Sequence, residues 1–301
     1  MVNINSKTKL VGLLGYPLDH TLSPAIHNAA FEEKRINNVY LPIEVKPDNF
    51  GHVIKTISCM NFIGFNITIP FKVEVMKYLD AIDETAKCIG AVNTVVVRDG
   101  KLIGYNTDGT GFLKSFEEAS NSTIAEKKVL VLGSGGASKA ICMTLALNKV
   151  GKLYICNRTH EKALTLASSI NKKVSAISSA IPMEYNAINE TIKKVDLLIN
   201  TTSLGMFPRT DEMPIDGSLL NKGLIVCDIV YNPRKTKLIL EAERLGCKTV
   251  PGLGMLVYQG AEAFEIWTGT KAPVKLMYSV VNEALERNGF KRIEKPDKPE
   301  F

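Results

Sequence analysis

The stretch Lys128-Val129-Leu130-Val131-Leu132-Gly133-Ser134-Gly135-Gly136-Ala137-Ser138 decides the fold of this chain. Its aliphatic run is typical of a strand that is buried on both faces. The run ends at Gly133, and helix-forming residues follow over 140–147. Strand, glycine turn and helix form the setting in which a Gly-x-Gly pattern indicates dinucleotide binding, because free N–H groups at the helix start face a pyrophosphate.

The glycine pattern departs from the strict fingerprint at its third position. Gly133 permits the tight turn and Gly135 lets the backbone approach a phosphate, but Ser138 replaces the third glycine. A serine is still small enough for close packing of the helix on the strand. The alternative is a plain strand–turn–helix without a ligand. The residues predicted to contact the cofactor here are Gly133, Ser134, Gly135, Gly136 and Ala137.

Length and composition limit the possible classes of protein. A chain of 301 residues suggests two domains, and 45% hydrophobic with 23% charged residues is ordinary globular composition. No apolar run approaches the roughly 20 residues of a membrane span, and the N-terminus has no signal-peptide core, so a cytoplasmic location is expected. The six cysteines are scattered and mostly lie in apolar runs, which predicts reduced thiols. The four histidines keep no ligand spacing with cysteine, so no metal site is expected. A net charge of +6 without a long basic block argues against a nucleic-acid partner.

Alternating strand and helix patterns predict an α/β fold in two parts. Residues 1–108 form the first part, which closes with a hairpin at Asp99-Gly100. A helix is expected directly after Pro70-Phe71-Lys72. Residues 109–253 contain the glycine-rich unit and further buried strands, as in a doubly wound Rossmann sheet. Two helices over about 254–290 close the chain, and 291–301 is expected to be a flexible tail.

The end of the second strand of this unit indicates which dinucleotide is bound. NAD-binding units carry an acidic residue there, which bonds the ribose 2′-hydroxyl. This chain has Asn157-Arg158-Thr159 instead, followed by Lys162. A guanidinium fork suits a phosphate group, and Asn157 and Thr159 add neutral hydrogen-bonding groups. An exposed basic helix start is the alternative, but after a phosphate loop the pattern favours the 2′-phosphate of NADP.

Polar residues outside the nucleotide unit supply candidate catalytic groups. They lie in Thr21-Leu22-Ser23-Pro24, in Asn66–Lys72, at Asn93 and in Asn106-Thr107-Asp108-Gly109. Each alone also fits a structural role, such as a helix cap for Ser23 or a turn at Asp108. Together with a hydride carrier they provide a lysine to exchange a proton, a carboxylate to orient it and amides for hydroxyl groups.

These motifs resemble those of the shikimate dehydrogenase family, and the resemblance runs from about Leu10 to Trp267. Eight motifs in the right order carry it, which is far more specific than any one of them. They are His20-Thr21-Leu22-Ser23-Pro24, Asn66-Ile67-Thr68-Ile69-Pro70-Phe71-Lys72, Gly90-Ala91-Val92-Asn93-Thr94, Asn106-Thr107-Asp108-Gly109, Gly133–Ser138, Asn157-Arg158-Thr159, Asp228-Ile229-Val230-Tyr231-Asn232-Pro233 and Gly252-Leu253-Gly254-Met255-Leu256-Val257-Tyr258-Gln259.

The resemblance implies an N-terminal substrate domain and a Rossmann-type NADP-binding domain with a cleft between them, the last helices returning to the first domain. It implies reversible reduction of 3-dehydroshikimate to shikimate with NADPH. Lys72 matches the catalytic lysine of the family and Asp108 its partner. The matching substrate contacts are Thr21, Ser23, Asn66, Thr68, Asn93, Tyr231 and Gln259. The positions that match the nicotinamide end of the cofactor are Glu84, Ile229 and Gly252.

One departure leaves the substrate open, since most of the family has serine where this chain has Thr21. The added methyl group narrows the pocket for the substrate carboxylate, so quinate or dual specificity is an alternative to shikimate. A ligand-sensing regulator on the same fold is a second alternative. That class would lack Lys72 or Asp108 or carry a DNA-binding segment, and the sequence shows neither change. The oligomeric state stays open between a monomer and a homodimer.

Overall fold

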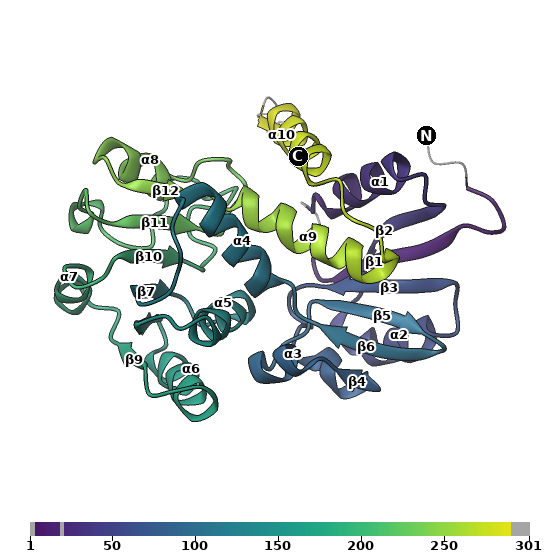
Figure 1. Ribbon diagram of the computed structural model, residues 1–301, viewed down its shortest axis with the longest axis horizontal. Helices are drawn as coiled ribbons and strands as arrows, with labels where there is room; N and C mark the ends of the chain where they lie inside the picture. Colours follow the sequence, from purple (N-terminus) through teal and green to yellow (C-terminus); the bar gives the residue numbers. More distant parts are fainter. Residues whose placement is uncertain (1–3, 19–20, 290–301) are drawn as a thin grey trace, which may run out of the picture.

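The computed structural model describes residues 4–18 and 21–289, and these form two six-stranded sheets (Figure 1). The first sheet comes from the N-terminal third of the chain and the second from the glycine-rich unit. The predicted α/β architecture with a Rossmann-type half is therefore confirmed. The expected flexible tail, 291–301, lies outside the described residues. Within the described ranges no helix is long and apolar enough to cross a membrane.

The first sheet is mixed, with strand order β2-β1-β3-β5-β6-β4. β1 runs parallel to both its neighbours, whereas β5 is antiparallel to β3 and β6. The predicted hairpin at Asp99-Gly100 is confirmed, and φ angles of 52° and 73° give both residues the left-handed conformation such turns require. The strands are β1 (Lys9–Gly15), β2 (Asn38–Glu44), β3 (Phe62–Ile67), β4 (Ala81–Ile82), β5 (Thr94–Arg98) and β6 (Lys101–Tyr105).

The second sheet is entirely parallel, with strand order β12-β11-β10-β7-β8-β9. The chain winds outward in both directions from β7, so the order reverses between β7 and β10. Ligands of such sheets bind outside the carboxyl ends of the strands at this point. The strands are β7 (Lys128–Leu132), β8 (Lys152–Cys156), β9 (Ser178–Ile181), β10 (Leu197–Asn200), β11 (Ile225–Asp228) and β12 (Lys248–Val250).

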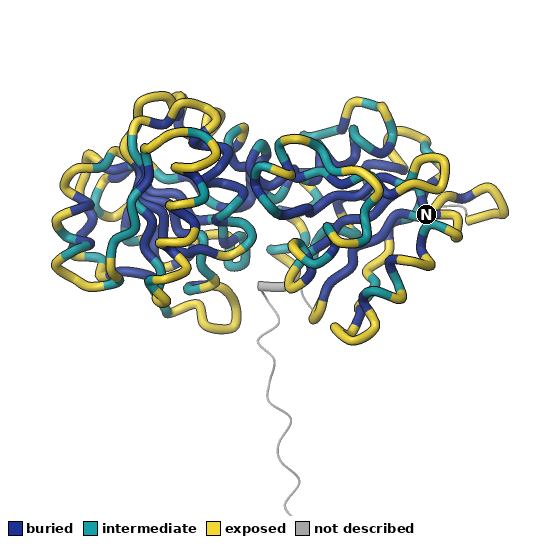
Figure 2. The backbone as a smooth tube through the Cα atoms, turned by 90° about the horizontal axis from the view of Figure 1, so that it is seen from below, coloured by how far each residue is buried: buried dark blue, intermediate teal, exposed yellow. Residues whose placement is uncertain are grey.

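Helices cover both faces of each sheet, and each face has its own buried cluster of hydrophobic residues. Figure 2 shows the buried backbone inside each half and the exposed backbone around it. The last two helices pack with α1 on the first sheet, which confirms the expected return of the chain. Trp267 of α9 fixes this packing because its indole N–H donates to the Val95 carbonyl at 2.9 Å. The helices are α1 (Ser23–Glu33), α2 (Phe50–Ile57), α3 (Glu84–Ile89), α4 (Asp108–Ser120), α5 (Gly136–Leu147), α6 (His160–Lys173), α7 (Tyr185–Ile192), α8 (Lys237–Arg244), α9 (Leu253–Thr268) and α10 (Val274–Gly289), with 3₁₀ turns η1 (Pro47–Asn49), η2 (Glu74–Tyr78) and η3 (Gly217–Leu219).

The helix expected after Pro70-Phe71-Lys72 is present only as a short 3₁₀ helix that begins later, at Glu74. The chain forms turns up to Val73 and then the short 3₁₀ helix η2. Phe71 explains the difference, because its ring is fully buried and stacks on Phe50 at a centroid distance of 4.0 Å. Burial of this ring fixes the turn that precedes Lys72, so tertiary packing overrides the local preference for helix.

Helix α4 joins the two halves and lies against α5 and α9 (Figure 1). Two glycines in its first turn make this approach possible. A Cβ atom on Gly109 would clash with the Thr144 hydroxyl of α5, and one on Gly111 would lie 2.6 Å from the backbone nitrogen of Gln259 on α9. The start of α4 is therefore held by backbone contacts to a helix of each half.

Candidate active site

A cavity of about 580 Å³ lies between the two sheets. The segments that follow the carboxyl ends of β1, β3, β7, β10 and β11 line it, together with the first residue of α4 and part of α9. The cavity therefore includes the switch point of the second sheet. The predicted site residues that line it are Thr21, Ser23, Asn66, Thr68, Lys72, Asn93, Asp108, Gly135, Gly136, Ala137, Ile229, Tyr231 and Gln259.

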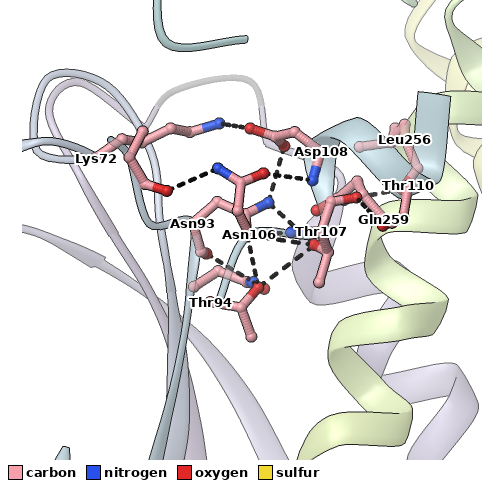
Figure 3. Close-up of polar contacts among 11 residues, drawn as sticks. Lys72, Asn93, Thr94, Asn106, Thr107, Asp108, Thr110, Leu256 and Gln259 are labelled. Carbon is pink, nitrogen blue, oxygen red and sulfur yellow. Dashed lines mark hydrogen bonds and ion pairs between the residues drawn. The ribbon is translucent and has the colours of Figure 1, made fainter. Parts of the chain in front are cut away.

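Lys72 and Asp108 form an ion pair in this cavity, with 2.6 Å between Nζ and Oδ2 (Figure 3). The two side chains are only 16% and 7% exposed. Asp108 is the first residue of α4, where the helix dipole favours a carboxylate. Its other oxygen accepts a hydrogen bond from Asn93 Nδ2 at 2.8 Å, and its backbone N–H donates to Asn106 Oδ1 at 3.0 Å. The carboxylate is thus fixed on both oxygens.

The glycine-rich turn faces this ion pair. A Cβ atom on Gly136 would lie 3.5 Å from Cδ of Lys72. Gly133 has a φ of +112°, and its carbonyl accepts a 2.7 Å hydrogen bond from the Ser138 hydroxyl, so the serine fixes the turn. No side chain caps the start of α5, which leaves its first N–H groups available to an anion. The open backbone at Gly135, where a Cβ atom would meet nothing within 4 Å, fits a pyrophosphate.

The predicted NADP-selecting residues lie outside the cavity, at the carboxyl end of β8 beside β7. Arg158 and Lys162 are exposed, and Asn157 Nδ2 donates to the Thr159 carbonyl at 2.9 Å. This location is one strand away from the glycine-rich turn. It suits the ribose end of a dinucleotide whose pyrophosphate lies at α5.

Other predicted cofactor residues have different surroundings. Gly133 and Ser134 form the buried base of the turn, and Gly252 begins α9 against the backbone of Ile229. The structure does not bring Glu84 to the cavity. Its side chain is 87% exposed at the start of α3, and it pairs with Lys87 one turn later.

Ser23 does not cap helix α1, so the capping alternative is wrong. It is the first residue of that helix, Leu22 is the cap position, and no side-chain cap bond is present there. Its backbone N–H instead donates to Thr21 Oγ1 at 3.3 Å. Both hydroxyl side chains line the cavity.

The sequence interpretation missed several residues that line the cavity. Their common signal is position, because most follow the carboxyl end of β10 or lie near its neighbours in the sheet. Knowing which strands lie on either side of the switch point would have been enough to predict these residues. They are Tyr16, Thr201, Thr202, Ser203, Met206, Phe207, Asn232 and Met255.

A buried carboxylate ties together the loops after β10 and β11. Asp228 is 1% exposed and accepts hydrogen bonds from Asn200 Nδ2 at 2.9 Å, the Val230 N–H at 3.0 Å and the Thr236 hydroxyl at 2.6 Å. Asn200 Oδ1 in turn accepts from the N–H and hydroxyl of Thr202. Burial raises the pKa of Asp228 to about 6, although these three hydrogen bonds oppose the shift.

Within the described residues no three His, Cys, Asp or Glu side chains are grouped so as to hold a metal ion. The arrangement therefore consists of an ion pair, a glycine-rich anion site and amide or hydroxyl groups. Fold and site define an α/β protein with a Rossmann-type half that faces a polar cavity in a second, mixed sheet.

Comparison with known proteins identifies the family. The shikimate dehydrogenase substrate binding domain matches residues 13–95, the shikimate/quinate 5-dehydrogenase model 116–238 and the shikimate 5′-dehydrogenase C-terminal domain 252–281. Shikimate dehydrogenase (NADP(+)) of Methanococcus aeolicus is 46% identical over 94% of this chain and 100% of its own. The chain belongs to the shikimate dehydrogenase family.

Two solved structures show the same fold. A shikimate dehydrogenase in complex with NADP⁺ is 41% identical, with a TM-score of 0.88 over 94% of this chain and 97% of its own. The shikimate 5-dehydrogenase of Listeria monocytogenes, in complex with shikimate and NAD, is 37% identical, with a TM-score of 0.87 over 93% and 98% of the chains. Relatives of this fold are thus known with either dinucleotide.

The raised pKa of Asp228 predicts how Asp228→Asn changes stability with pH. The folded pKa of about 6 lies above the unfolded value near 3.9. The favourable contribution of the protonated carboxyl is therefore complete below about pH 4 and is lost as pH rises through 6, by about 3 kcal/mol. Asparagine does not titrate. The unfolding free energy of the variant minus that of the parent should therefore increase between pH 4 and 7. Urea unfolding of both proteins across this range measures the gain.

The matched control is Asp48→Asn, which removes an exposed carboxylate in place of a buried one. Parallel curves for Asp228→Asn itself would contradict the assigned pKa.

Proposed function

We propose that the protein catalyses the NADP-dependent, reversible reduction of 3-dehydroshikimate to shikimate. The observation that carries the proposal is the Lys72–Asp108 ion pair, which faces the uncapped glycine-rich start of α5 across one cavity. Membership of the shikimate dehydrogenase family supports it. Residues 1–108 and the helices over about 254–290 would bind substrate, and residues 109–253 would bind NADP.

The bound nicotinamide supplies a hydride to the ring carbonyl carbon of the substrate. Lys72 places a cationic ammonium group beside the carbonyl oxygen, where negative charge develops, and gives that oxygen its proton. Asp108 holds the ammonium group at 2.6 Å and so fixes its direction. In the oxidation direction the amine of Lys72 accepts the proton of the substrate hydroxyl as hydride leaves the ring carbon.

The remaining polar residues orient a polyhydroxylated ring. The hydroxyls of Thr21 and Ser23, at the start of α1, bind the substrate carboxylate. Amide, hydroxyl and phenol groups around the cavity bond the ring hydroxyls, because each can donate or accept. These ring contacts are Asn66, Thr68, Asn93, Tyr231 and Gln259.

The cofactor is held along the second sheet. The N–H groups over Gly133–Ala137 bind the pyrophosphate, and Ile229 and Gly252 lie toward the nicotinamide. Asn157, Arg158, Thr159 and Lys162 bind the ribose 2′-phosphate. Glu84 keeps no part in this arrangement, because its carboxylate is exposed away from the cavity.

Quinate is the second candidate substrate, because Thr21 stands where most of the family has serine. The threonine methyl group narrows the carboxylate end of the cavity, where the quinate ring differs from shikimate. A spectrophotometric assay that follows NADPH, with shikimate and quinate each tested with NADP and NAD, decides. The expected result is a higher kcat/KM for shikimate with NADP than for any other pair. Turnover of quinate but not of shikimate would contradict the proposed substrate. If neither compound is turned over, the proposed function is wrong.

Removal of the proposed catalytic lysine gives the next prediction. Lys72→Ala should lower kcat at least about 100-fold, since acid–base groups contribute roughly 10²–10⁴ to rate. Its melting temperature should stay close to that of the parent, because the Asp108 carboxylate keeps its hydrogen bond from Asn93 and its place at the start of α4. The control Lys235→Ala removes an exposed lysine of similar pairing, 2.8 Å from Glu243, and should keep full kcat. Near-parental turnover of Lys72→Ala would exclude the lysine from proton transfer.

Arg158 tests the cofactor preference. Arg158→Ala should raise KM for NADP at least about tenfold and leave KM for NAD unchanged, because only NADP carries the 2′-phosphate that a guanidinium binds. Initial rates with each cofactor at saturating shikimate give both constants. Arg244→Ala, which removes an exposed arginine paired with Glu241 on α8, is the control and should change neither. Equal effects on NADP and NAD would contradict the role of Arg158.

A further inference from the structure

A chain of buried polar side chains leads from Tyr40 on β2 to Asp108. Tyr40 and Thr94 are 1% and 0% exposed, and neither lines the cavity. Figure 3 shows the part of the chain around Thr94, Asn93 and Asp108. Four links span it. Tyr40 Oη donates to Asn66 Oδ1 at 2.8 Å, Asn66 Nδ2 to Thr94 Oγ1 at 3.0 Å, Thr94 Oγ1 to Asn93 Oδ1 at 2.9 Å, and Asn93 Nδ2 to Asp108 Oδ1 at 2.8 Å.

Backbone groups fix the direction of this chain at both asparagines. Asn66 Nδ2 also donates to the Asn93 carbonyl at 3.1 Å, and a carbonyl can only accept. A flipped Asn66 amide would set two oxygens against each other, so Asn66 Oδ1 must face Tyr40. Asn93 Oδ1 accepts from the Thr107 N–H at 2.9 Å, and an N–H can only donate. Asn93 Nδ2 must therefore face Asp108.

Every donor in the chain thus points toward the carboxylate of Asp108. Burial raises the pKa of Tyr40, which keeps its hydroxyl protonated as the first donor. Thr94 Oγ1 accepts a hydrogen from Asn66, and its own hydrogen is donated to Asn93 Oδ1, which can only accept. Hydrogen bonds aligned in one direction polarise and strengthen one another in a low dielectric. The last donor bonds one oxygen of Asp108 while Lys72 bonds the other.

We propose that Thr94 and Tyr40 are positioning residues for the reaction, which act through Asn93 on the Lys72–Asp108 pair. The proposal rests on the proposed function. Without the Thr94 hydroxyl, one hydrogen of Asn66 and one lone pair of Asn93 lose their partner in the core. Asn93 keeps its hydrogen bonds to Thr107 but loses the donor that polarises its amide, so its hydrogen bond to the Asp108 carboxylate is weakened. The loss falls on kcat and leaves KM for NADP unchanged, because the hydrogen bonds end on the Lys72–Asp108 pair and the cofactor is bound by the other half.

A threonine series tests this role. Thr94→Val keeps the shape and removes the hydroxyl, and it should lower kcat about tenfold, equivalent to about 1.4 kcal/mol on the barrier. KM for NADP should stay unchanged. Thr94→Ser restores the hydroxyl and should recover most of the lost kcat. Thr191→Val is the matched control, since Thr191 is a buried threonine on α7 whose hydroxyl bonds only within its helix, to the Ala187 carbonyl.

Tyrosine variants provide a second arm that does not depend on the folding of Thr94→Val. Tyr40→Phe should lower kcat severalfold without changing KM for NADP, whereas Tyr154→Phe on β8 of the other sheet should leave kcat at the parental value. Parental kcat in Thr94→Val or Tyr40→Phe overturns the proposal. Equal losses in Thr94→Val and Thr94→Ser overturn it as well, because the hydroxyl would then not be the acting group.

A measurement without turnover separates this proposal from the proposed function. In ¹⁵N-asparagine-labelled protein, the side-chain amide protons of Asn66 and Asn93 should exchange slowly with solvent, and Thr94→Val should accelerate both. Thr191→Val should leave their exchange as in the parent. Fast exchange in the parent would contradict the hydrogen-bonded series from Tyr40 to Asp108, even if the protein reduces 3-dehydroshikimate. If exchange is slow but the parent does not turn over shikimate, the hydrogen-bonded series is present and the proposed function is wrong.

Discussion

The contact that the rest of the site depends on is the backbone approach of α4 to α5 and α9. Gly109 and Gly111 leave no room for a side chain against Thr144 and Gln259. Asp108 directly precedes this contact, so its position is fixed relative to both halves at once. Its partner Lys72 comes from a turn anchored in the first sheet by the buried ring of Phe71. The ion pair therefore forms only because one glycine-rich helix start fits between two other helices.

Each half also contains a buried polar network that fixes one carboxylate near the cavity. On the substrate side, donors converge on Asp108 from the interior of the first sheet. On the nucleotide side, donors converge on Asp228 and tie the loops after β10 and β11, which line the same cavity. Each network ends on a carboxylate that accepts on both oxygens, and satisfied polar networks of this kind fix one geometry. The glycine-rich turn has no such network, since the Ser138 hydroxyl fixes it and the N–H groups at the start of α5 are uncapped.

The sequence predicted the parts of the molecule whose signals are local. The strand–glycine–helix unit around Gly133, the Asp99-Gly100 hairpin and the α/β class follow from periodicity and turn chemistry, and all are confirmed. Local signals could not show that Phe71 is buried against Phe50, so the helix expected from Pro70 begins only at Glu74 and is a 3₁₀ helix. Nor could they place Glu84, whose carboxylate faces solvent, or find Thr201, which reaches the cavity only because β10 lies beside β7 in the sheet. These positions depend on contacts between residues far apart in the chain.

The rim of the cavity has a different character from its floor. Tyr16 and Ile69 on the first half and Met206 and Phe207 on the second are large, partly exposed apolar side chains that line the cavity. A ligand that spans both halves buries these surfaces and removes water from the floor, where Lys72 lies. In a site without water, the charge that develops beside the ammonium group is stabilised more strongly than it would be in solvent. The apolar rim therefore contributes to the chemistry although none of its side chains takes part in proton transfer.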